Sequence, residues 1–152
     1  MNTTGTVNLN TTASPTAARP TRPVRTPRRL LRSIAAVFAG LLANFILASA
    51  ADAVLHAAGL YPPFPQRMAD SLFLLAAAYR TLFGVAGAYL TARLAPHRPM
   101  VHALVLGGIG VVLSIAGAIT FGKYGPAWYS LAIIAISLPC AWAGARLHRR
   151  RR

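Results

Sequence analysis

The chain has 152 residues and a formal net charge of +14, with sixteen Lys and Arg residues against two acidic residues. Hydrophobic residues make up 55% of the chain and charged residues 12%, which is about half the charged share of a typical soluble domain. The composition therefore argues against an ordinary soluble domain. Because the basic residues stand in short blocks beside apolar stretches, we expect them to contact anionic lipid headgroups of the bilayer rather than nucleic acid.

The N-terminal segment is rich in Thr, Pro and Arg, and its first 29 residues contain no acidic residue and almost no large apolar residue. Such a segment buries too little apolar surface to offset the entropy lost on ordering. We predict a disordered cytoplasmic arm over residues 1–32. Its composition also fits an organellar transit peptide.

The first apolar run covers residues 34–58, which is long enough for a tilted membrane span. A cleaved signal peptide is an alternative, because Arg residues precede the run and Ala48-Ser49-Ala50 has the pattern of a cleavage site. Against that alternative, the leader would be unusually long and the apolar character continues past Ala50. The lone polar residue Asn44 is expected to hydrogen-bond another helix.

Three further apolar runs follow, each able to cross the hydrocarbon layer: residues 71–94, 100–121 and 127–147. Proline-rich or short connections separate them, and a basic tail, residues 148–152, ends the chain. Asp70 is expected to cap the second span, and Pro139 to kink the fourth. The sequence thus predicts an all-α integral membrane protein, a four-helix transmembrane bundle that follows the disordered arm.

Basic residues are distributed asymmetrically about these spans. Thirteen of the sixteen lie in the arm, in or next to the 94–99 turn, or in the tail, whereas Arg67 and Lys123 lie on the opposite side and Arg80 lies within a span. The positive-inside rule then places both termini in the cytoplasm. The Arg-rich, Lys-poor composition suggests the inner membrane of a bacterium.

One charged pair falls inside the predicted spans. Asp52 lies six residues from the end of the first span, ~9 Å along a helix, and Arg80 lies nine residues into the second, ~14 Å along it. Their offset of ~5 Å is within reach of an arginine side chain, and the two side chains lean toward each other. His56 is four residues after Asp52, on the same helix face. These three residues form the candidate polar site, as a structural ion pair or as a transport site.

Other polar and sulfur-containing residues offer little chemistry. Asp52 and His56 are too few for a metal site, which needs three or four ligands, so we expect no metal. His97 and His102 flank a turn and fit a membrane interface. The lone Cys140 is expected to behave as a small apolar residue. The sequence contains no Glu, and no serine has a His and an acid placed for catalysis, so we expect no enzymatic activity and no cofactor.

Small residues recur at spacings of three and four within the last three spans. Small faces let helix backbones approach closely in lipid, either inside one bundle or between two copies of the chain. We expect packing inside the bundle, with a dimer interface as the alternative. The candidate packing residues are Gly84, Gly87, Gly107, Gly110, Ser114, Gly117 and Gly144.

The plan of four short spans with brief loops resembles that of the small multidrug transporters. Those proteins depend on a glutamate in the first span, and this sequence contains none. Asp52 also lies nearer the membrane face than such a site should. The chain is therefore not assigned to that family.

Three functions are consistent with these residues. The leading interpretation is a non-enzymatic structural or accessory membrane subunit that packs with itself or within a larger complex. The alternative is a small transporter or channel with its polar site at Asp52, His56 and Arg80. A third is a membrane anchor whose basic arm holds anionic lipid or nucleic acid. The first two differ in whether the polar site is sealed between helices or lines a cavity that water can reach.

Overall fold

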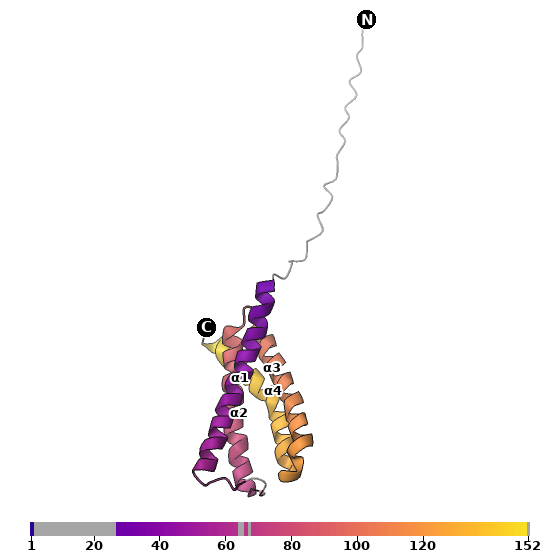
Figure 1. The fold of residues 1–152 in the computed structure, drawn as a ribbon. Coiled ribbons are helices and arrows are strands. Elements are labelled where there is room, and N and C mark those ends of the chain that lie inside the picture. The colour runs from indigo at the N-terminus through magenta and orange to yellow at the C-terminus, as the bar shows by residue number, and fades with distance from the viewer. Residues whose placement is uncertain (2–26, 64–65, 67, 152) are drawn as a thin grey trace.

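The computed structural model is an all-α bundle, and it describes residues 1, 27–63, 66 and 68–151 (Figure 1). A short 3-10 turn separates the last two of its four long helices. The four are α1 (Pro27–Ala57), α2 (Asp70–Leu94), α3 (Pro99–Phe121) and α4 (Ala127–Arg150). Each is long and apolar enough to span a membrane. The predicted fold class is confirmed, and the chain is a small multi-pass membrane protein.

Two helices, α1 and α4, extend beyond the predicted spans, both at the end of the bundle that carries most of the arginines. Helix α1 begins at Pro27, so residues 27–32, predicted as part of the disordered arm, are helical. Leu30 and Leu31 make this turn apolar enough to continue the helix. Helix α4 continues to Arg150, and the basic residues of its last turn interact favourably with the helix dipole. The rest of the predicted arm, residues 2–26, lies outside the described residues.

The start of α2 differs from the prediction in a smaller way. Ala69 occupies the N-cap position, where Asp70 was expected, and it makes no capping hydrogen bond through its side chain. Asp70 is instead the first helical residue. Its negative charge there still favours the helix N-terminus.

The bundle has two unlike ends. At the basic end, α1 begins, α4 ends, and residues 95–98 join α2 to α3. At the distal end, residues 58–69 join α1 to α2, and residues 122–126 join α3 to α4. The main packing pairs are α2 with α4, α3 with α4, and α1 with α2, whereas α1 touches α3 only lightly.

The buried core lies in the basic half of the bundle and is made mostly of alanine. Its members come from α2, α3 and α4: Ala88, Ala92, Ala103, Leu106, Ala141 and Ala145. Glycines bring the backbones together around it. A Cβ atom on Gly144 would lie 2.5 Å from the Val85 carbonyl oxygen, and one on Gly87 would lie 2.7 Å from that of Gly40. Helices α1, α2 and α4 are therefore in close backbone contact here.

The helices separate toward the distal end, as α3 and α4 show. A Cβ atom on Gly107 would lie 2.6 Å from the Cβ of Ala141, and one on Gly110 would lie 3.7 Å from the Cβ of Ser137. One on Gly117 would meet nothing within 4 Å. In Figure 1 the α1–α2 pair and the α3–α4 pair likewise diverge away from the basic end. The continuous small-residue stripe predicted for α3 thus packs tightly only in its first part.

Candidate functional site

A cavity of about 710 Å³ occupies the distal half of the bundle. All four long helices contribute to its walls, and it extends from the distal connections, at Tyr61 and Tyr124, to the core residues Ala88 and Leu106. Its size falls within the range of about 300–1,000 Å³ typical of small-molecule sites. The cavity is therefore large enough to hold a ligand.

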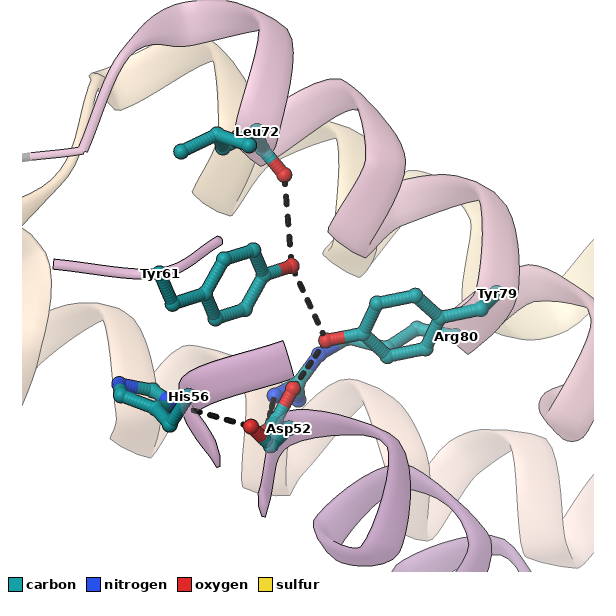
Figure 2. A network of polar contacts seen from close by, with 6 residues as sticks. All are labelled: Asp52, His56, Tyr61, Leu72, Tyr79 and Arg80. Carbon is teal, nitrogen blue, oxygen red and sulfur yellow. Dashed lines mark hydrogen bonds and ion pairs between the residues drawn. The ribbon is translucent and has the colours of Figure 1, made fainter. Parts of the chain in front are cut away.

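A polar network stands on the wall of this cavity (Figure 2). Helix α1 supplies Asp52, and α2 supplies Tyr79 and Arg80. The Nη2 atom of Arg80 donates to Oδ2 of Asp52 at 2.6 Å, and the Tyr79 hydroxyl donates to Oδ1 of the same carboxylate. The Tyr61 hydroxyl lies 3.4 Å from that of Tyr79 and 3.5 Å from the Leu72 carbonyl oxygen, to which it can donate. The network thus joins α1 to α2 near their distal ends.

The contact between Asp52 and Arg80 is the one that helix spacing predicts. The Arg80 and Asp52 side chains are 39% and 32% exposed, and both line the cavity. They are therefore not sealed between α1 and α2, which was the condition that separated the transport interpretation from the structural one. Whether the pair serves transport or stability stays a prediction.

His56 lines the same cavity but does not contact the carboxylate. Its Nδ1 atom lies 2.9 Å from the backbone oxygen of Asp52, one helical turn earlier, and its ring stands edge-on to Tyr61 with the centroids 5.3 Å apart. His56 therefore lies beside the network but is not part of the ion pair.

The guanidinium of Arg80 has more hydrogen-bond donors than the network uses. Both oxygens of Asp52 already accept a hydrogen bond, but only one of the five N–H donors of the Arg80 guanidinium is used for this. Its Nε atom is buried, so the donors that a ligand could reach are those of the Nη atoms of this side chain, which is 39% exposed. A guanidinium has only donors, and a carboxylate has only acceptors. A ligand with an acceptor group would therefore complement this site better than one with further donors.

Sequence reasoning missed several residues of the cavity wall. Tyr61 joins the network, and Tyr129 lines the cavity and packs on Phe73 with ring centroids 5.1 Å apart; neither was among the candidate site residues. Asn44 also lines the cavity, and among the described residues it makes no hydrogen bond to another helix, contrary to the prediction. The available signal was that both tyrosines stand beside the ends of membrane spans at the distal side, where Tyr61 follows the span that carries Asp52.

The remaining candidates are placed as follows. The buried Cys140 packs beside Gly84, and its thiol donates to the Thr81 carbonyl oxygen at 3.6 Å. His97 and His102 stack edge-on at the basic end, 5.2 Å apart. Across the part of the chain that the structure describes, no three His, Cys, Asp or Glu side chains gather as metal ligands would.

The small residues predicted to pack divide into two groups. Gly87, Gly107 and Gly144 make close helix contacts inside the bundle, with Gly84 in ordinary contact. Gly110, Ser114 and Gly117 line the distal cavity without such close contacts, and Gly84 and Gly107 also reach its wall. A stripe that looks uniform in sequence therefore serves packing at one end and leaves space at the other.

These features define a four-span membrane protein with a largely apolar cavity that carries a polar network at one end of the bundle. Comparisons of the chain with protein-family models, with curated proteins and with solved structures find no match. Its function is therefore inferred from its own residues and their contacts.

The hydroxyl of Tyr79 is expected to stabilise the network measurably. Tyr79→Phe removes one hydrogen bond to a charged acceptor, and we expect a loss of about 1–2 kcal/mol in the free energy of unfolding. The matched control is Tyr89→Phe, since the Tyr89 hydroxyl makes no hydrogen bond among the described residues. Thermal unfolding in mild detergent measures both. Equal melting temperatures for the two variants would contradict a stabilising role for the network.

Proposed function

We propose that the protein binds a small amphipathic solute in its distal cavity, as a small transporter does. One observation carries this proposal: the Asp52–Arg80 pair lines a large cavity between the helices instead of being enclosed by them. An ionisable pair inside a membrane protein is costly, and its exposure to a cavity is typical of a substrate pathway.

The cavity wall indicates the chemistry of the solute. Polar groups gather at the distal end, around Asp52, Tyr79 and Arg80. The deeper wall is mostly apolar, as at Leu41 and Phe45, with Asn44 as a polar exception. An amphipathic molecule would place its apolar part in the deeper region and an acceptor group, such as a carbonyl or carboxylate, near Arg80. This arrangement uses the donors that Asp52 leaves free.

The orientation of the bundle belongs to the same proposal. The positive-inside rule places the basic end in the cytoplasm, so the cavity would face the outer side of the membrane. For the membrane itself, the composition favours the inner membrane of a bacterium. A solute would then enter from outside and stop at the alanine-rich core.

A second candidate function is a non-enzymatic structural or accessory subunit. It is favoured by the fact that both oxygens of Asp52 are satisfied inside the chain, so the ion pair can serve simply to join α1 and α2. In that case the cavity would be filled by lipid or by a partner, with no solute passing through it.

Cysteine labelling separates the two functions. In a Cys140→Ala background, Ser114→Cys and Ser130→Cys place thiols on the cavity wall with almost no change in volume. A membrane-impermeant thiol reagent added from outside should label both in native membranes. Leu131→Cys is the matched control, since this residue is 66% exposed on the outer face of α4 and should lie in hydrocarbon, out of the reagent's reach.

The same labelling experiment tests the orientation. Ser71→Cys, exposed near the distal end, should react from outside, and Ser33→Cys, near the basic end, should not. If the two cavity positions react only after denaturation, the cavity is sealed and the structural function is favoured. Reaction of Ser33→Cys from outside would show that the bundle has the opposite orientation.

A further inference from the structure

A second hollow, the α1–α3 groove, lies at the basic end of the bundle, on the side where α1 touches α3 only lightly. Its volume is about 430 Å³. The groove is lined by nine residues: Ser33, Ile34, Val37, Phe38, Leu41, Val101, His102, Val105 and Ile109. Seven of them are apolar, and the two polar ones, Ser33 and His102, lie toward the basic end of the bundle. The α1 wall alone, from Ser33 to Leu41, extends for ~12 Å of helix.

The charges around this groove have no acidic side chain to neutralise them. The chain has two acidic residues, and both belong to the distal half: Asp52 pairs with Arg80, and Asp70 begins α2. The side chains at the basic end therefore include many arginines and no carboxylate. Anions from outside the chain balance these charges, and at a bilayer surface the anions at high local concentration are lipid headgroups.

Two of these arginines lie next to the groove. The Ser33 hydroxyl donates to the Arg29 carbonyl oxygen at 3.0 Å, and the His102 Nδ1 atom lies 3.2 Å from the Arg98 carbonyl oxygen. Each arginine is thus one helical turn from a polar residue of the groove, and both side chains are exposed. Arg32, also exposed, stands between Arg29 and the groove along α1.

We propose that the α1–α3 groove binds an anionic phospholipid, with one acyl chain in the groove and the headgroup phosphate against Arg29, Arg32 and Arg98. A helix of a second copy of the chain fits less well. Helices associate in lipid through small residues, whereas the groove is lined by Ile, Val, Leu and Phe and contains no glycine. A flexible acyl chain can follow such a wall. The site is independent of the function proposed for the distal cavity.

Native mass spectrometry of the full-length protein, delipidated in detergent, tests this site. The protein is titrated with phosphatidylglycerol and with phosphatidylcholine carrying the same acyl chains. We expect the first phosphatidylglycerol to bind at least ten times more tightly than phosphatidylcholine. Val105→Trp, which fills the groove, should weaken that binding about tenfold. Leu131→Trp, on the exposed outer face of α4, should leave it unchanged.

A charge control separates a specific site from general attraction. The double variant Arg29→Gln/Arg98→Gln should lose the preference for phosphatidylglycerol, whereas Arg149→Gln/Arg150→Gln, with the same change in charge on α4, should keep it. If Val105→Trp does not fold, Val101→Phe fills the same wall with a smaller ring. Equal binding of the two lipids, or unchanged binding in the filled variants, would overturn the proposal. So would a wild-type dimer that the filled variants dissociate, since the occupant would then be a second copy.

Discussion

Gly144→Ala is expected to destabilise the bundle strongly for so small a change. The added Cβ would lie 2.5 Å from the Val85 carbonyl oxygen and 2.7 Å from the Tyr89 backbone nitrogen. These are backbone atoms of α2, so no side chain can move aside and the two helices must separate. We expect a loss of about 1–3 kcal/mol, even though alanine itself favours helix by about 1 kcal/mol. The melting temperature in mild detergent measures this loss.

Gly117→Ala is the matched control for that variant. It makes the same substitution within a helix, but its Cβ would meet nothing within 4 Å. Its stability should be unchanged or slightly raised, because only the helix propensity changes. If both variants melt at the same temperature, α2 and α4 are not in the close contact described here.

The spans were predictable because hydrophobic length is a strong signal. Each predicted run lies almost entirely within one observed helix, and the prolines at 62, 63, 96 and 99 fall where a helix is absent or just beginning. The ends were less predictable, because arginine is a good helix former and adds no apolar signal. For this reason the first turn of α1 and the last turn of α4 were assigned to the arm and the tail.

The ion pair was predictable because helix rise converts sequence distance into depth. The depth of each residue is counted from the loop that joins the two antiparallel helices. Because the depths of Asp52 and Arg80 are similar, their contact could be predicted. This count could not find Tyr61 or Tyr129, which lie in a connection and in the first turn of another helix. Their approach to the site depends on how helices α1, α2 and α4 are arranged around it.

The cavity was not predictable from the stripe of small residues. Gly107 and Gly117 have the same spacing pattern, but only Gly107 meets a facing helix. The difference comes from the divergence of α3 from α4, which depends on the packing of the whole bundle. The core packs closely in the basic half and the helices separate in the distal half, which is the space that the proposed solute would occupy.

The largest coupling is expected between Asp52 and Arg80. Asp52→Asn leaves the Arg80 charge without its partner, and Arg80→Gln does the same to Asp52. Each should cost about 2 kcal/mol of stability, less than the loss of about 3–5 kcal/mol on breaking a fully buried pair, because both side chains are about a third exposed. The double variant removes both charges, so its loss should be smaller than the sum by about 1–2 kcal/mol.

Thermal unfolding of the four proteins in mild detergent provides this double-mutant cycle. The control cycle replaces Arg80→Gln with Arg93→Gln. Arg93 lies in the last turn of α2 at the basic end, where its side chain is exposed, ~20 Å along α2 from Arg80 and its contact with Asp52. Its coupling with Asp52→Asn should be close to zero, because distant sites without shared partners add. Additive losses in the first cycle would show that the contact between Asp52 and Arg80 contributes nothing of its own to stability, and would contradict this prediction.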